Sequence, residues 1–246
     1  MTKPMLEKVE LMTNHNPSRR TMGHAAKCAL AGGFSLALFA PADAAAAPAA
    51  FTFTAPNPGW VTVLIGGVPL SDPEGDTPGA RDIVGDAQNP LLFVASDASH
   101  VYFRLRVDSD PLQNPGNFGP FGWGCFISTD GDPQTYEYSM IIDGVNNADV
   151  IHFYKNTVTT VPNSPSDEPD LPAVSSVFDP LTAAVFHAQV VGAPSTFGGT
   201  PDFFIDWAID VSDAAAAGFD RGVPSQYYCG SSNNGTTVAA DCSAGT

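Results

Sequence analysis

Several aspartates lie at short spacings in this sequence, and their carboxylates could bind a metal ion. The segment Thr129-Asp130-Gly131-Asp132 places two carboxylates around a glycine that permits a tight turn. Asp108 and Asp110 follow an apolar run and could supply further oxygens. Because Ca²⁺ prefers hard oxygen donors, we predict a structural calcium site formed by Asp108, Asp110, Asp130 and Asp132. The alternative is that Asp and Gly are simply the residues that turns require.

Aromatic residues could form a surface for carbohydrate. Trp123 lies between two glycines, and Tyr136 and Tyr138 alternate along one face of an expected strand. Aromatic rings present a flat apolar face with a polar edge, which suits a pyranose ring. We therefore predict Trp123, Tyr136 and Tyr138 as ligand-binding residues, with packing in the core as the alternative.

Catalytic motifs are missing from the sequence. It contains no G-x-S-x-G turn, no H-E-x-x-H pair and no paired-cysteine zinc spacing. His100, His152 and His187 each stand alone in an expected strand. A pair of carboxylates for glycoside hydrolysis stays open as a third alternative, because acidic residues are numerous. The prediction is a protein without catalytic residues.

The first residues have the composition of a secretory signal. Arg19, Arg20 and Lys27 precede the apolar run Cys28–Ala40, and small residues follow it. The run is about thirteen residues long, whereas a membrane-spanning helix needs roughly 20. We predict a cleavable signal peptide over residues 1–44 and an Ala/Pro-rich spacer over residues 45–57, so that no segment stays in the membrane after cleavage. The export route stays open.

Charge restricts the partners of the exported part. Five of the ten basic residues and three of the 26 acidic residues fall within residues 1–44, which leaves 5 basic and 23 acidic residues. This balance of about −18 repels phosphate backbones and anionic lipids. The acidic surface argues against nucleic-acid and membrane-surface binding, and it favours attraction of divalent cations.

Cysteine usage indicates an oxidising compartment. Cys125, Cys229 and Cys242 lie beyond the predicted signal, so at most one bridge can form among them. A bridge between Cys229 and Cys242 would close a short polar loop, and it is the pairing that we predict. A bridge between Cys125 and Cys229 on neighbouring strands is the alternative.

Strand patterns fill the remainder of the chain. In Val101–Val107 the apolar residues alternate with Tyr102, Arg104 and Arg106, which places the two arginines on a solvent-facing side. Phe203, Ile205, Trp207 and Ile209 repeat the alternation, so Trp207 is expected in the core. About nine such runs, separated by turns rich in Pro, Gly, Asn and Asp, predict an all-β antiparallel sandwich of immunoglobulin-like or jelly-roll type. We place this domain at residues 58–235, followed by a C-terminal tail at 236–246.

Two adjacent segments carry a resemblance to a known group of domains. The segments His100–Asp108 and Phe121–Asp132 resemble core strands of extracellular sandwich domains of the family 9 carbohydrate-binding module and DOMON type. The resemblance covers roughly residues 80–235 and rests on strands and turns. It implies the fold first and a ligand-binding role second.

These observations lead to one expected role and two alternatives. We expect a secreted or cell-surface binding module without catalysis, which binds carbohydrate and is stabilised by calcium. The first alternative is a surface-assembly protein that contacts another protein, and the second is a hydrolase.

Overall fold

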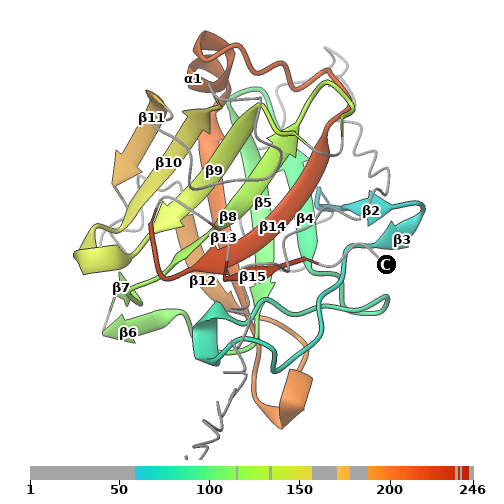
Figure 1. Cartoon of the computed structure of the whole chain (residues 1–246), viewed down its shortest axis with the longest axis vertical. Coiled ribbons are helices and arrows are strands. Elements are labelled where there is room, and N and C mark those ends of the chain that lie inside the picture. Colours follow the sequence, from blue (N-terminus) through green and yellow to red (C-terminus); the bar gives the residue numbers. More distant parts are fainter. Residues whose placement is uncertain are drawn as a thin grey trace, which may run out of the picture.

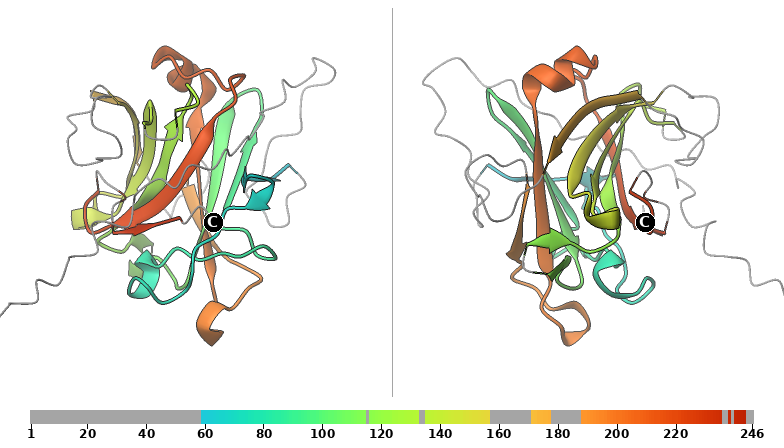
Figure 2. Two further views of the ribbon diagram at one scale, coloured as in Figure 1. Left: turned by 45° about the vertical axis from the view of Figure 1, so that its right-hand side comes forward. Right: turned by 90° about the vertical axis from the view of Figure 1, so that its left-hand side faces the viewer.

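Two antiparallel sheets packed face to face make up the protein. The structure is a computed structural model, and it describes residues 59–114, 116–132, 135–156, 171–177, 188–235, 238 and 240–243. The predicted signal peptide and spacer lie outside these residues. Figure 1 shows the sheets one behind the other, and Figure 2 shows them edge-on.

The first sheet has five strands. Their spatial order is β1 (Val61–Thr62), β4 (Leu92–Ser96), β5 (His100–Val107), β13 (Phe203–Asp210) and β12 (Ala188–Gly192). The central pair, β5 and β13, runs in unbroken register from Val107 opposite Phe203 to His100 opposite Asp210. These are the two segments in which the sequence alternates most clearly, so the clearest patterns form the middle of the sheet.

The second sheet has six strands. Their order is β11 (Leu171–Val177), β10 (Val150–Lys155), β9 (Tyr138–Asp143), β8 (Gly122–Ser128), β14 (Gln226–Ser232) and β15 (Asp241–Cys242). All strand pairs in both sheets are antiparallel. The predicted all-β antiparallel sandwich is therefore confirmed.

Short elements connect the strands at the two ends of the sandwich. Two small hairpins pair β2 (Leu64–Ile65) with β3 (Val68–Pro69) and β6 (Leu112–Asn114) with β7 (Asn117–Phe118). The helical elements of the described residues are the 3₁₀ turns η2 (Gly79–Arg81), η3 (Val145–Asn147) and η4 (Phe197–Gly199) and the short helix α1 (Val211–Ala216). Helix α1 and η2 lie at opposite ends of the sandwich (Figure 1).

The core fills the space between the sheets. The ring of Phe103 stacks on that of Trp207 at 5.7 Å between centroids, and Tyr227 from the other sheet meets Phe103 edge-on at 6.0 Å. All three side chains are fully buried. Each such burial contributes about 1.5–3 kcal/mol to folding, so this cluster is a main source of stability. The predicted core position of Trp207 is confirmed.

The outer face of the first sheet departs from the prediction. Arg104 and Arg106 point away from the core as expected, yet only 3% and 2% of their surfaces are exposed. Arg104 donates two hydrogen bonds of 2.7 Å to Asp206 on β13, and its guanidinium lies 4.6 Å from the ring centroids of both Trp60 and Phe204. The predicted wet face is wrong here, because aromatic rings cover both arginines and the buried carboxylate of Asp206 pairs with Arg104.

The disulfide also departs from the prediction. Cys125 on β8 and Cys229 on β14 are direct cross-strand partners, and their sulfur atoms are bonded. The predicted Cys229–Cys242 bridge is wrong, because strand register places Cys125 opposite Cys229. The alternative pairing between neighbouring strands is the one that forms.

The domain extends beyond the boundary predicted at residue 235. Strand β15 belongs to the predicted tail, yet Cys242 and Asp241 pair with Gly230 and Ser231 of β14. The tail therefore contributes a strand to the second sheet.

Candidate metal centre

Four aspartates converge at the end of the sandwich opposite α1. Asp72, Asp76 and Asp82 come from the loops before β4, and Asp241 comes from β15. Each offers a carboxylate oxygen, and these oxygens all lie within 4.8 Å of one another. Asp72, Asp82 and Asp241 are buried and Asp76 is half-buried. Figure 1 shows β15 beside the teal loop that carries the other three.

Local geometry brings the first three aspartates together. The backbones of Asp72 and Gly85 exchange two hydrogen bonds of 3.0 Å, which fixes the start of the loop. Gly75 has a φ of +83°, a conformation that residues with a side chain rarely adopt. Its amide donates a hydrogen bond of 2.6 Å to Oδ2 of Asp82. The sharp turn at Gly75 thus folds the loop back onto Asp82.

Contacts across the sequence bring in the fourth aspartate. Oδ2 of Asp241 accepts a hydrogen bond of 2.7 Å from the amide of Ile83, next to Asp82. The Ser231 hydroxyl, opposite Asp241 in the sheet, donates to the carbonyl oxygen of Arg81. The β14–β15 pair therefore rests directly on the loop of the other aspartates.

Electrostatics within the cluster oppose full ionisation. Burial raises the pKa of Asp82 to about 6, against partial relief from the amides of Gly75 and Thr77. Burial, joined by the nearby charges of Asp76 and Asp82 and a hydrogen bond to Asp76, raises the pKa of Asp241 to about 7, against partial relief from the amide of Ile83. Buried carboxylates in contact require either protons or a cation. Near neutral pH, binding of a cation would therefore displace protons from Asp82 and Asp241.

A carboxylate oxygen of Asp82 has no hydrogen bond from the described residues. Oδ1 of Asp82 is buried, and none of the described residues donates to it. An ionised buried oxygen without a donor is costly, and coordination to a cation is one way to satisfy it. The four carboxylates, with this oxygen of Asp82 among their atoms, make a group of hard donors that could hold a metal ion.

The four predicted metal ligands do not form this site. Asp108 follows β5 at the end of the sandwich where η2 lies, whereas Asp130 and Asp132 follow β8 at the α1 end (Figure 1). Within the described ranges, none of them belongs to a group of three or more candidate ligands. The predicted ligand set is therefore wrong, because the strands carry its members to opposite ends.

The predicted metal ligands make local backbone contacts instead. Asp130 Oδ1 accepts the amide of Asp132 at 2.8 Å, and Asp110 Oδ1 accepts the amide of Leu112 at 2.9 Å. Both are turn interactions, in line with the alternative considered for these residues. Asp108 comes nearest to the cluster, since its amide donates to the carbonyl oxygen of Asp82 at 2.9 Å.

The three predicted sugar-binding residues are buried. Trp123 is fully inaccessible and donates its indole N–H to the carbonyl oxygen of Ala80. Tyr136 and Tyr138 are 3% and 5% exposed, and they stack on Phe126 and Phe153 respectively. A sugar ring cannot reach these faces, so the predicted aromatic platform is wrong. The alternative of packing applies to all three residues.

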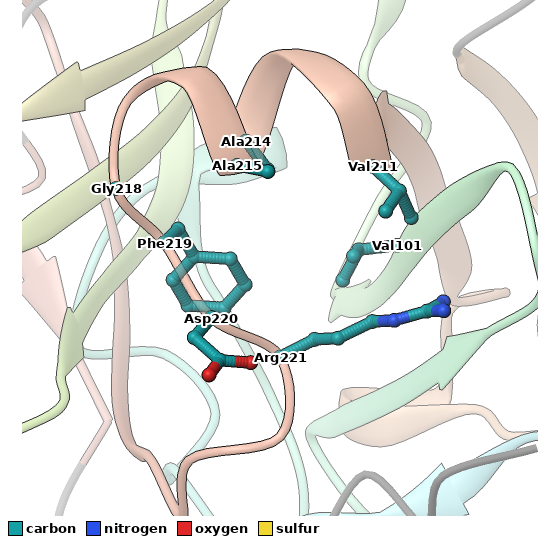
Figure 3. Close-up of a pocket in the computed structure, with 8 residues that line it drawn as sticks. All are labelled: Val101, Val211, Ala214, Ala215, Gly218, Phe219, Asp220 and Arg221. Atoms are coloured by element: carbon teal, nitrogen blue, oxygen red, sulfur yellow. The ribbon is translucent and has the colours of Figure 1, made fainter.

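A cavity of about 280 Å³ lies beneath α1 (Figure 3). Val101, Val211, Ala214 and Phe219 make its lining largely apolar, and Asp220 and Arg221 stand at its edge. Both polar side chains have structural partners, because Asp220 accepts the amide of Gly222 and Arg221 donates to the carbonyl oxygen of Asp97. The cavity thus lacks convergent polar groups that would orient a ligand.

The sequence held a partial signal for the true cluster. Asp72-Pro-Glu-Gly-Asp76 is an acidic turn around a glycine, of the same kind as the turn at Asp130. Nothing in the sequence indicated that Asp241, in the predicted tail, would lie beside this turn. Only the pairing of β15 with β14 places it there.

Within the described residues, no helix is long and apolar enough to cross a membrane. Comparison of the chain with protein-family models, with curated proteins and with solved structures finds no match.

Proposed function

We propose that this protein is an exported, non-catalytic β-sandwich module that binds Ca²⁺ at Asp72, Asp76, Asp82 and Asp241 and acts outside the cytoplasm. The observation that carries the proposal is the convergence of these four carboxylates within 4.8 Å in a largely buried site. The signal-like leader and the bridge between Cys125 and Cys229 support the location, because disulfides persist in oxidising compartments.

Calcium fits this donor set better than other common metals. Zinc prefers nitrogen and sulfur ligands, and the cluster offers carboxylate oxygens alone. Magnesium demands near-ideal octahedral geometry and keeps several waters, whereas calcium accepts six to eight oxygens in irregular arrangements. Carboxylates from a loop and a separate strand make an irregular set of this kind. Extracellular calcium modules bind in the range of about 10⁻⁴–10⁻³ M, which suits an exported protein.

The partner that we expect is a polysaccharide or another surface protein. Every aromatic side chain of the described residues is buried or half-buried, and the exposed large apolar side chains there are Val61, Val68 and Val223. Recognition would therefore use polar and acidic groups, with the bound ion among them, instead of an aromatic platform.

Thermal unfolding tests the calcium site. A ligand at about 100 times its dissociation constant stabilises by about 2.7 kcal/mol, which for a domain of this size shifts Tm by about 5–10 °C. We expect this rise on replacing chelator with excess Ca²⁺ at neutral pH, and its loss in Asp82→Asn. The matched control is Asp213→Asn, which removes one carboxylate from α1 at the other end and should keep the rise. Equal melting with and without Ca²⁺ in the unsubstituted protein would remove the proposal.

A further inference from the structure

We infer that the calcium ion attaches strand β15 to the body of the domain, so that calcium withdrawal releases this strand while the rest of the sandwich stays folded. The inference rests on the calcium site proposed above and adds a regulatory consequence to it. It follows from how differently the two contributors to the cluster are held.

Strand β15 is short, and its described pairing with the sheet is limited to β14. It contains two residues, and its register with β14 consists of Cys242 opposite Gly230 and Asp241 opposite Ser231. The flanking residues add backbone hydrogen bonds of 2.8 Å from Ala240 to Ser231 and from Ser243 to Cys229. Net stabilisation by a backbone hydrogen bond is only about 1 kcal/mol. Pairing with β14 therefore holds the segment weakly.

The backbone around β15 lies very close to Gly230 of β14. A Cβ atom on Gly230 would overlap the carbonyl oxygens of Asp241 and Val238. The strand thus lies directly against the backbone of β14, and a small outward shift breaks its hydrogen bonds.

Two further contacts among the described residues join this segment to the aspartate loop. Asp241 accepts the amide of Ile83 at 2.7 Å, and the Thr77 hydroxyl lies 3.4 Å from the carbonyl oxygen of Ala240. The carboxylate of Asp241 is therefore both a candidate metal ligand and the main link between β15 and the loop.

The aspartate loop is held independently of the ion. Hydrogen bonds join Asp72 to Gly85 in both directions, and the amide of Leu91 donates to the carbonyl oxygen of Leu70. The side chain of Trp123 also holds Ala80. When a cation leaves, the link that it makes between β15 and the loop is lost, and β15 is the contributor with the weaker remaining restraints. We expect β15 to detach first.

Hydrogen–deuterium exchange of the full chain tests the inference. Exchange is followed in peptides that contain Ala240 to Ser243, in peptides of the aspartate loop, and in peptides of the central pair β5 and β13. Chelator should speed exchange at Ala240–Ser243 by about tenfold or more relative to excess Ca²⁺ and leave β5 and β13 unchanged, because local opening precedes global unfolding. The variant Asp241→Asn should exchange fast at Ala240–Ser243 in both conditions, and Asp213→Asn should behave as the unsubstituted protein.

A parallel measurement separates the two proposals. Terbium occupies calcium sites, and its sensitised luminescence reports whether the site takes a cation. If terbium binds and Ca²⁺ displaces it, while exchange at Ala240–Ser243 is the same with Ca²⁺ and with chelator, the strand attachment is wrong and the calcium site stands. If all peptides speed up together with chelator, the ion stabilises the whole domain and the inference is also wrong. If neither ion binds, the proposed function itself is wrong and this inference falls with it.

Discussion

Trp123 donates its indole N–H to the carbonyl oxygen of Ala80, and the two atoms lie 2.7 Å apart. Ala80 belongs to η2, between Asp76 and Asp82, whereas Trp123 lies in β8, inside the core. One hydrogen bond therefore connects the middle of the second sheet to the loop that carries three of the four clustered aspartates. The tryptophan predicted to face a sugar acts instead as a support for the candidate metal centre.

Trp123→Phe should weaken this support. Phenylalanine keeps most of the packing but cannot donate to Ala80, so we expect a loss of about 1–3 kcal/mol in the free energy of unfolding. Sensitised terbium luminescence should fall markedly, because the hydrogen bond places the Trp123 indole beside the loop of Asp82. Unchanged luminescence in the variant would contradict this assignment of the donor. The matched control is Phe121→Leu, which alters a neighbouring ring on the same strand region without removing a tryptophan.

Metal-free protein should lose stability as pH rises. The pKa values of Asp82 and Asp241 in the folded state, about 6 and about 7, lie above the ordinary value of 3.8. The folded state therefore binds more protons than the unfolded state between about pH 4 and pH 7, and the free energy of unfolding falls through that window as pH increases. The measurement is chemical denaturation in chelator at a series of pH values.

The double variant Asp82→Asn/Asp241→Asn is the control for this pH dependence. Its unfolding free energy should fall less steeply over the same window, because the two groups with raised pKa values are gone. The calcium-induced rise in stability should also grow from pH 5 to pH 7 in the unsubstituted protein, since protons compete with the cation. A steeper fall in the double variant would refute the role given to these two residues.

Removal of the disulfide should destabilise the protein strongly. The bridge joins residues with a sequence separation of 104, and closing a loop of about 100 residues is worth about 4.7 kcal/mol in the chain-entropy account, with measured values of about 2–5 kcal/mol. We expect Cys125→Ala/Cys229→Ala to lower the free energy of unfolding within that range. Peptide mapping without reductant should recover Cys125 linked to Cys229, and Cys242→Ala should leave that link intact. Recovery of a Cys229–Cys242 peptide would contradict the pairing.

The buried ion pair of the first sheet should be sensitive to loss of one member. Asp206 has no exposed surface, and Arg104 beside it is 3% exposed. Asp206→Ala leaves the guanidinium charge buried without a carboxylate, which typically costs about 3–5 kcal/mol. Asp210→Ala, four residues along the same strand, removes a partly exposed partner of His100 and should cost less than about 1 kcal/mol. Denaturant unfolding of the two variants should show this difference, and equal losses would contradict it.

The strands could be predicted from the sequence where apolar and polar residues alternate within a single segment. Val101–Val107 and Phe203–Asp210 alternate clearly, and they pair in the middle of the first sheet. The burial of Arg104 could not be predicted in this way, because alternation shows which side a residue faces and not what covers that side. Trp60, which stacks on Arg104, lies on the chain well before β5.

The site and the disulfide depended on pairing between distant segments. A short loop favoured Cys229 with Cys242, but the register of β14 against β8 places Cys125 opposite Cys229. Likewise, Ile83 and Asp241 are 158 positions apart and still share a hydrogen bond. Acidic turns identified the kind of chemistry, whereas only the arrangement of strands decides which of the turns meet.

The Cys125–Cys229 bridge also determines how the molecule would respond to mechanical tension. If the two ends of the chain are pulled apart, force passes from one cysteine directly to the other through the covalent bond. The segment from Phe126 to Tyr228, which includes β9, β13 and α1, then lies outside the load path. Until the bond itself is broken, tension would not stretch this enclosed segment directly, whereas the flanking strands, β5 among them, could be extended.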